Sequence, residues 1–224
     1  MRSSLDAARI ALMLVLAWAL PLDAAPSAAT PPGEAPFRPL FNGHDLDGWQ
    51  HIGPGRFVVE DGLLRTEGGM GLLWYTREPI GHALLRVVFR MTGDDPDSGV
   101  FIRVPTPPQD PWDAINHGYE IEIGEWPSEY SRTGVVYSFS KALAHPLNPK
   151  GEWNTMEILI DGPLTQVHLN GVLVTDYREG QPVPPRSTEP GDPAAGPRPD
   201  QGYIGLQNHP GGAVWFREIS VRSP

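Results

Sequence analysis

The sequence predicts an all-β fold, a jelly-roll β-sandwich of two antiparallel sheets. Two observations support this prediction. Around a dozen short apolar runs follow one another along the chain, and Gly, Pro, Asn and Asp separate them. No segment of the sequence keeps the 3.6-residue periodicity of an amphipathic helix. We therefore expect short strands joined by turns.

The expected strands can be placed in order along the chain. A hairpin over 57–65 turns at Asp61-Gly62, and a later hairpin turns at Asn170-Gly171, because both dipeptides suit two-residue hairpin loops. The first and last strands are expected to pair. The strands expected after the first hairpin cover 83–91, 99–104, 119–123, 134–139, 153–160, 165–170, 172–177, 202–207 and 213–222.

The N-terminal region has the pattern of a secretory signal peptide over residues 1–25. Arg2 and Arg9 supply the basic end, an apolar run over 10–20 follows, and small residues suited to cleavage come next. An uncleaved membrane anchor is the alternative, although the apolar run has only about half of the ~20 residues that a spanning helix needs. We expect a periplasmic or secreted protein with no stable membrane insertion after signal cleavage.

The mature part reads as one domain. Residues 26–36 are typical of a flexible leader, and 37–224 form a single jelly-roll domain that contains a Pro-rich loop over 178–201. Strand-like sequence resumes directly after this loop, so it is not a linker between domains. Loops of this length are functional lids or disordered segments, and the sequence leaves both open.

Composition narrows the chemistry. The chain has no cysteine, which excludes disulfides, a thiolate nucleophile and cysteine metal sites. Its formal net charge is −10, and an acidic domain repels phosphate backbones, so we expect no nucleic-acid partner. A neutral substrate suits this charge better.

The segment 119–123 alternates apolar and acidic residues with a period of two. This pattern predicts a strand whose apolar side chains enter the core, while Glu120 and Glu122 share the other face, roughly 7 Å apart. Two such carboxyl groups can act as acid and base, or as ligands of a divalent cation. The alternative is that both simply face solvent on an ordinary amphipathic strand.

Other polar side chains are candidates for the same site. Arg103 ends an apolar strand and could pair with the acidic face or bind sugar hydroxyl groups, or it could be an exposed arginine at the end of a strand. Gln207 and His209 share strand parity with Tyr203, and histidine can transfer protons. A histidine in a loop can also be ordinary polar surface.

The tryptophans divide into two groups. Trp112 and Trp126 lie in polar, Pro-containing stretches, so they are candidate platforms for stacking on sugars. Trp153 and Trp215 begin or lie inside strands and are expected in the core. The sequence lacks a Gly-x-Ser-x-Gly elbow, a P-loop, a dinucleotide fingerprint and His-Glu-x-x-His, which argues against serine hydrolases, nucleotide enzymes and thermolysin-like proteases.

Eight short motifs, in this order, give the chain its resemblance to a known family. They are Phe41–Trp49, Val58–Leu64, Asp97–Arg103, Gly118–Ile123, Gly151–Thr155, His168–Gly171, Gly202–His209 and Val214–Ile219. Over about residues 39–222 the chain resembles the 3-keto-disaccharide hydrolase domain family, secreted bacterial proteins with a concanavalin A-like jelly-roll fold.

The resemblance implies a site and a reaction. The family's polar site would map to Arg103, Glu120, Glu122, Gln207 and His209, and further to Tyr137 and Asn154. The implied reaction cleaves a glycoside oxidised to a ketone at C3, through removal of the C2 proton, elimination and hydration. The base would be Glu120 or His209. Arg103 would stabilise the enolate oxygen, with help from any cation bound to Glu120 and Glu122.

Three positions depart from the family pattern. Asp97 stands where asparagine is usual, Glu122 where glutamine is common, and Glu125 where aspartate is common. The extra carboxyl group at position 122 adds negative charge, which would strengthen cation binding or raise the pKa of Glu120. It also opens the question of whether the substrate is the family's usual one.

Two other functions fit the same fold. A retaining β-glucanase would use Glu120 and Glu125, since jelly-roll β-glucanases carry a similar Glu-x-Asp-x-x-Glu strand. A non-catalytic carbohydrate-binding module would bind glycans through its tryptophans. Cleavage of unoxidised β-glucan would favour the first, and binding without any product would favour the second.

Overall fold

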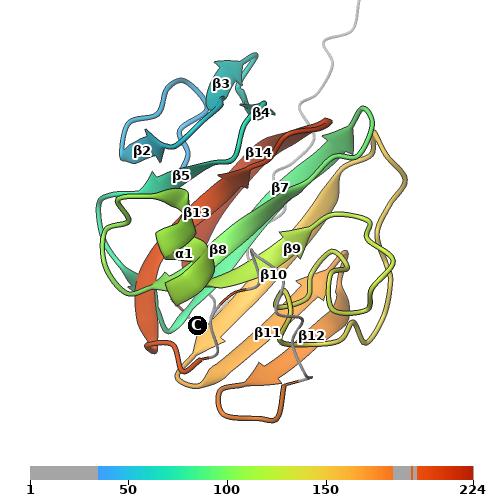
Figure 1. Ribbon diagram of the computed structural model, residues 1–224. Coiled ribbons are helices and arrows are strands. Elements are labelled where there is room, and N and C mark those ends of the chain that lie inside the picture. The colour runs from blue at the N-terminus through green and yellow to red at the C-terminus, as the bar shows by residue number, and fades with distance from the viewer. Residues whose placement is uncertain (1–34, 184–192, 194–195, 224) are drawn as a thin grey trace, which may run out of the picture. The chain divides into compact units, whose positions relative to one another are not determined.

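The computed structural model describes residues 35–183, 193 and 196–223. Two antiparallel sheets dominate these residues, which confirms the predicted β-sandwich (Figure 1). The predicted signal peptide, most of the predicted leader and the middle of the Pro-rich loop lie outside the described residues. Within the described ranges, no helix combines the length and apolar character needed to cross a membrane.

The larger sheet has eight strands in the order β12-β11-β10-β7-β14-β4-β3, with β1 paired to β14. The predicted pairing of the first and last strands is therefore confirmed, since Arg38 lies opposite Val221. The bounds are β1 Arg38–Pro39, β3 Arg56–Glu60, β4 Leu63–Glu67, β7 Ala83–Thr92, β10 Asn154–Asp161, β11 Leu164–Leu169, β12 Val172–Arg178 and β14 Ala213–Arg222.

The smaller sheet has six strands in the order β2-β5-β13-β8-β9, with β6 paired to β13. Its adjacent strands β13, β8 and β9 come from separate parts of the sequence, so residues near 100, 120 and 207 become neighbours. The bounds are β2 Trp49–Ile52, β5 Gly71–Tyr75, β6 Ile80–Gly81, β8 Ser98–Val104, β9 Tyr119–Ile123 and β13 Gln201–Asn208.

Both predicted hairpin turns are confirmed. Asp61 and Gly62 have φ values of 50° and 78°, and Asn170 and Gly171 have values of 50° and 80°. Two successive residues with positive φ match the right-handed twist of the paired strands. These turns set the registers of β3 with β4 and of β11 with β12.

The main core lies between the two sheets. On β9, Tyr119, Ile121 and Ile123 point into it, as the alternation of the sequence predicts. A second, smaller apolar cluster lies on the opposite face of the smaller sheet, where Phe101 and Val104 pack with Ala114 and Ile115. This outer face is therefore only partly covered, and the uncovered part carries the polar side chains described below.

The outer cluster is covered by a short helix that the sequence analysis did not predict. Helix α1 spans Pro111–His117 and lies beside β8 in Figure 1. Asp110 caps its N-terminus by accepting a hydrogen bond from the Trp112 N–H, and the Asp113 side chain completes the capping box. Seven residues are two turns, which is too short for a periodic signal.

Two other expectations were wrong. The segment 134–139 is not a regular strand, although Gly134, Val135 and Tyr137 form backbone hydrogen bonds with β9. Trp153 and Trp215 are half-buried and not core residues. The guanidinium of Arg90 stacks on both rings, at 4.8 and 5.1 Å from their centroids.

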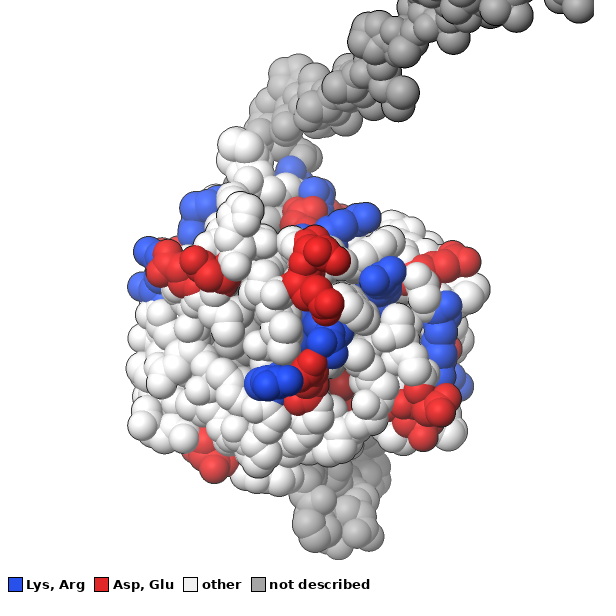
Figure 2. All heavy atoms as spheres, turned by 90° about the horizontal axis from the view of Figure 1, so that it is seen from above, with Lys and Arg blue, Asp and Glu red and all other residues white. Residues whose placement is uncertain are grey.

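Charged side chains of both signs lie beside one another on the face shown in Figure 2. In the described part of the chain, this face has no continuous basic area of the kind that binds nucleic acid.

Candidate functional site

A pocket of about 610 Å³ opens on the uncovered outer face of the smaller sheet, next to α1. Strand β9 supplies Glu120 and Glu122, and Asp97 directly precedes β8. Strand β13 and the segment after it supply Gln207 and His209, and α1 and the loop after β9 supply the tryptophans. The lining residues are Met70, Asp97, Trp112, Ile115, Glu120, Glu122, Trp126, Pro127, Ser128, Ser131, Tyr137, Gln207 and His209.

Glu120 and Glu122 both line this pocket, so the predicted common face of β9 is correct. In the antiparallel pairing with β8, Glu122 lies opposite Gly99 and Glu120 opposite Phe101. A Cβ atom at Gly99 would lie 2.1 Å from Glu120 Oε1. The absence of a side chain at Gly99 therefore leaves the space in which the Glu120 carboxyl group lies.

The surroundings of both glutamates favour their neutral forms. Burial, and then the charge of Asp97, raise the pKa of Glu120 well above its usual range. Burial also raises the pKa of Glu122, and the charges of Glu120 and Asp97 add to this effect. The nearby Trp126 side chain opposes the shift at Glu122. A protonated carboxyl group at neutral pH can donate a proton or a hydrogen bond.

His209 lies at the rim of the pocket, directly after β13. Its Nδ1 is 3.2 Å from Asp97 Oδ2 and 2.9 Å from the carbonyl oxygen of Pro210. Both neighbours are hydrogen-bond acceptors, so Nδ1 is the protonated nitrogen of the neutral ring. Nε2 then carries the free electron pair and can accept a proton.

Asp97 is the functional residue that the sequence analysis did not place in the site. It is 9% exposed and directly precedes β8. Burial raises its pKa, while the charge of His209 and hydrogen bonds from Ser98 and Trp126 lower it. The available signal was its position in the Asp97–Arg103 motif, where an acid replaces the usual asparagine.

The remaining predicted contacts largely fall in the pocket. Gln207 and Tyr137 line it, and the Tyr137 N–H donates a hydrogen bond to the Glu120 carbonyl oxygen. Trp112 and Trp126 line it as well, with 46% and 41% of their surfaces exposed. The prediction that these two tryptophans are exposed is therefore confirmed.

Arg103 does not lie in the pocket, which corrects the expected pairing with the acidic face. Two residues of β8, Ile102 and Arg103, lie opposite one residue of β13 at this point, so one extra residue bulges and the alternation of side chains reverses. Arg103 itself has a φ of 58°, in the left-handed region. Its side chain therefore leaves the outer face.

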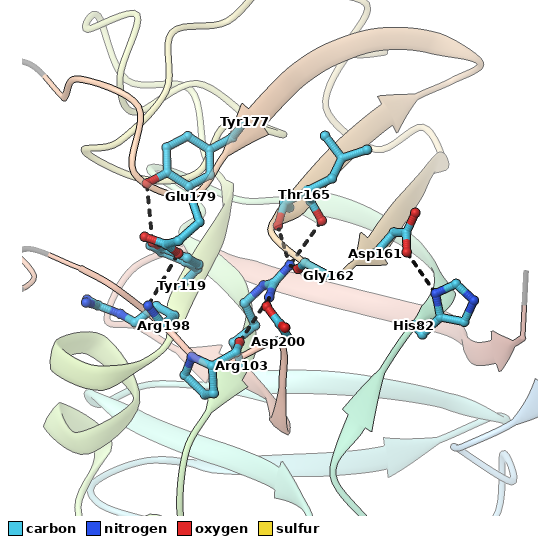
Figure 3. Close-up of polar contacts among 12 residues, drawn as sticks. His82, Arg103, Tyr119, Asp161, Gly162, Thr165, Tyr177, Glu179, Arg198 and Asp200 are labelled. Carbon is cyan, nitrogen blue, oxygen red and sulfur yellow. Dashed lines mark hydrogen bonds and ion pairs between the residues drawn. The ribbon is translucent and has the colours of Figure 1, made fainter.

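The guanidinium of Arg103 is 1% exposed and holds other segments together (Figure 3). It donates hydrogen bonds to the carbonyl oxygens of Pro199, Gly162 and Leu164, at 2.9, 2.7 and 3.0 Å. These contacts join the end of the Pro-rich loop to the turn between β10 and β11. The role of Arg103 is structural in this geometry.

The Pro-rich loop is also fixed at the base of α1. The Arg198 guanidinium donates hydrogen bonds to the carbonyl oxygens of Gly118 and Asn116. The Tyr119 hydroxyl donates one to Glu179 (Figure 3). The residues of this loop that the structure describes do not line the pocket. They do not support a lid over the site.

Asn154 also lies outside the pocket. It is 1% exposed on β10, where its side-chain oxygen accepts hydrogen bonds from the Asn148 N–H and the Asn170 side chain. These bonds hold the loop before β10 against the hairpin turn after β11. The predicted substrate contact is therefore not supported by its position.

A cation bound by Glu120 and Glu122 would find few further protein ligands. Across residues 35–183, 193 and 196–223, no group of three or more histidine, aspartate or glutamate side chains is arranged to hold a metal ion. Two carboxylates would have to be completed by water or substrate oxygens.

Residues 36–222 match the family described as a 3-keto-alpha-glucoside-1,2-lyase-like domain. No curated protein matches the chain.

Solved structures share the fold. A predicted glycosyl hydrolase from Parabacteroides distasonis is 27% identical, with a TM-score of 0.70, covering 85% of this chain and 100% of that chain. A second from the same organism is 20% identical, with a TM-score of 0.69 and coverages of 84% and 94%. A carbohydrate-binding module from Bacillus subtilis is 12% identical, with a TM-score of 0.51 and coverages of 79% and 96%.

Proposed function

The chain belongs to the family of 3-keto-alpha-glucoside-1,2-lyase-like domains, and on that premise we propose that it cleaves glycosides whose sugar carries a ketone at C3. Membership supports a carbohydrate-active, glycosyl hydrolase-like protein. The finer proposal rests on one observation. A histidine oriented by a carboxyl group, His209 with Asp97, borders the same pocket as the half-buried Glu120.

The first step removes the proton at C2. A ketone at C3 makes this proton acidic, because the electron pair left on C2 delocalises onto the ketone oxygen as an enolate. His209 Nε2 takes the proton, since its Nδ1–H is held by Asp97 and the Pro210 carbonyl group. Gln207, at the same pocket wall, is the amide donor available to the enolate oxygen.

The second step expels the leaving group from C1. The enolate electrons form a C1=C2 double bond as the bond from C1 to the glycosidic oxygen breaks, and Glu120 gives that oxygen its proton. The raised pKa of Glu120 is suited to this role, because the group stays protonated where an ordinary carboxyl would be ionised. Water then adds across the double bond, with hydroxyl to C1 and a proton to C2.

Sugar binding falls to the aromatic wall. Trp112 and Trp126 present exposed indole faces to the pocket, and Tyr137 lies on its lining as well. Aromatic faces stack on the C–H faces of sugars. A volume of about 610 Å³ lies in the range of small-molecule sites.

The direct test is turnover of a 3-keto-disaccharide and of its unoxidised parent, with product analysis. We expect only the oxidised sugar to be cleaved, with or without chelator. His209→Gln and Glu120→Gln should each lower kcat/KM by about 10²-fold. The matched controls His44→Gln and Glu152→Gln, at exposed positions outside the pocket, should behave as the unchanged protein. Near-full activity of both site variants would refute the assignment.

The position of Glu125 argues against a retaining β-glucanase. Glu125 is exposed and does not line the pocket, so Glu120 and Glu125 do not face one substrate site. A carbohydrate-binding module remains the second candidate function, because two exposed tryptophans flank the pocket. Binding of an oxidised disaccharide without any product would favour it.

The cellular location is proposed from the N-terminal pattern alone. Residues 1–25 suit a secretory signal, so the protein is expected in the periplasm or medium. N-terminal sequencing of the protein from each cell fraction tests this. A mature chain that retains Met1 in the cytoplasmic fraction would contradict it.

A further inference from the structure

Glu122 has no role in the proposed reaction. The residue is 3% exposed, and its Oε1 has no hydrogen-bond partner among the described residues. The side chain lines the pocket. We propose that Glu122 binds a protonated amino group, so that the preferred substrates are glycosides of amino sugars. This inference rests on the proposed function and names its substrate class.

The acidic lining of the pocket favours such a ligand, because a bound cation lowers the pKa values of the carboxyl groups beside it. Three carboxyl groups, those of Asp97, Glu120 and Glu122, line it, while no lysine or arginine does within the described part of the chain. His209 is the lining residue that can become cationic, and it is engaged with Asp97. A ligand that brings its own positive charge supplies what the pocket lacks.

The buried Oε1 atom of Glu122 favours a ligand that donates hydrogen bonds. An unpartnered acceptor out of contact with water carries a desolvation penalty until a donor reaches it. An ammonium group offers three N–H donors and a full charge, so one of its hydrogen bonds can satisfy Glu122 Oε1. A hydroxyl group would offer one donor without charge.

The tryptophans support the same ligand. Trp112 and Trp126 expose indole faces to the pocket, and such faces attract cations as well as sugar C–H groups. An acidic sugar, in contrast, would add a further carboxylate to the pocket and raise the pKa values of its three carboxyl groups still more, which disfavours its binding. The pocket should therefore rank amino sugars above neutral sugars, and neutral sugars above uronates.

Binding of an amino sugar should also release a proton from Glu122. In the free protein, burial raises the pKa of Glu122. The charges of Glu120 and Asp97 raise it further, while Trp126 opposes the shift. An ammonium group beside Glu122 lowers that pKa. Binding of the amine should therefore release protons and tighten as pH rises through the titration of the carboxyl group.

The test is calorimetry on the full chain, after chelator treatment, with three disaccharides. They are cellobiose, its diamino counterpart built from two glucosamine units, and the N,N′-diacetyl form of that diamine. We expect the diamine to bind at least about tenfold more tightly than the other two, with proton release seen in buffers of different ionisation enthalpy. The diacetyl form keeps the size and removes the charge.

Two matched variants complete the design. Glu122→Gln should abolish the preference, so that the diamine binds no more tightly than cellobiose. Glu125→Gln, three residues along and exposed, should keep the preference. The inference is overturned if the diamine has no advantage, if none of the three binds, if Glu122→Gln keeps the advantage, or if Glu122 instead binds Ca²⁺ or Mg²⁺ tightly without favouring the amine.

Failure of this inference can be told apart from failure of the proposed function. Turnover of a neutral 3-keto-disaccharide without preference for amines would overturn only the substrate class. A strong preference for the diamine with no turnover of any oxidised disaccharide would overturn the proposed reaction and leave the amine site in place.

Discussion

His209 and Asp97 meet at 3.2 Å, and this contact joins the end of β13 to the start of β8 across two neighbouring strands. Because Nδ1 also lies 2.9 Å from the Pro210 carbonyl oxygen, both acceptors hold the same nitrogen protonated. The opposite nitrogen is then free to remove a proton. The role of Asp97 is to position and orient His209.

Replacing Asp97 tests this positioning role. Asp97→Ala removes one of the two acceptors at Nδ1 and should lower kcat by roughly 10–10²-fold with little change in KM. Asp97→Asn keeps a side-chain oxygen that can accept from Nδ1–H, so it should recover most of the lost rate. Steady-state kinetics with a 3-keto-disaccharide would measure both. Equal loss in the two variants would contradict the orienting role.

The dependence of kcat on pH should reveal the titration of Glu120, the proposed proton donor. If Glu120 must be protonated to protonate the leaving group, the rate is high below its pKa and falls as pH rises through that pKa. Because burial and Asp97 raise this pKa, the fall should come well above the usual range of a glutamate. The dependence of kcat on pH gives the answer. A fall near pH 4 to 5 would place an ordinary, solvated carboxyl group in this role.

Glu122→Gln should stabilise the protein at alkaline pH. A glutamate whose pKa is raised in the folded state is protonated more readily there than in the unfolded chain. Its stabilising contribution is thus present below the unfolded pKa and lost as pH rises through the folded pKa.

Thermal unfolding at two pH values would measure this effect. Near pH 4 the variant and the unchanged protein should have similar free energies of unfolding. At pH 8 the variant should be more stable by roughly 1 kcal/mol or more. A variant less stable at pH 8 would show that the charged carboxyl group has a stabilising partner.

Gly99→Ala should disturb the site through Glu120. The new Cβ would lie 2.1 Å from Glu120 Oε1 and 2.6 Å from its Cγ, so the carboxyl group must move. We expect kcat/KM to fall at least about tenfold. In a Glu120→Gln background that is already slow, the same change should cost much less, because the two effects share one group. Fully additive losses would contradict this coupling.

Arg103 should matter for stability and not for the chemistry. Its buried guanidinium holds three carbonyl oxygens, so Arg103→Ala should cost roughly 3–5 kcal/mol of unfolding free energy. The milder Arg103→Lys should lose less stability and, assayed below its melting temperature, keep near-normal kcat. A large loss of kcat in well-folded Arg103→Lys would show that Arg103 contributes to catalysis.

The sequence was a good guide wherever a local pattern determines the structure. Alternation on 119–123 correctly oriented Glu120 and Glu122, and the Asp61-Gly62 and Asn170-Gly171 turns formed as expected. Simple alternation failed at Arg103, because the bulge in β8 depends on how β13 pairs with it. Pairing partners far apart in the chain leave no local trace.

The same limit explains the other gaps. Asp97 joins the site only because β8 and β13 are neighbours, which brings it to His209. Asn154 resembled a family position, yet on β10 it belongs to the other sheet and bonds with Asn148 and Asn170. Helix α1 is too short for periodicity, although Asp110-Pro111 carried a capping signal.

In the proposed reaction, one proton leaves C2 and another returns to C2 from solvent. A 3-keto-disaccharide should be cleaved in D₂O, and the released 3-keto sugar examined by mass spectrometry at early times. Protein-free samples and His209→Gln provide the background exchange. The account predicts one deuterium at C2 of the product formed by the unchanged protein. Complete turnover with the original hydrogen retained at C2 would contradict it.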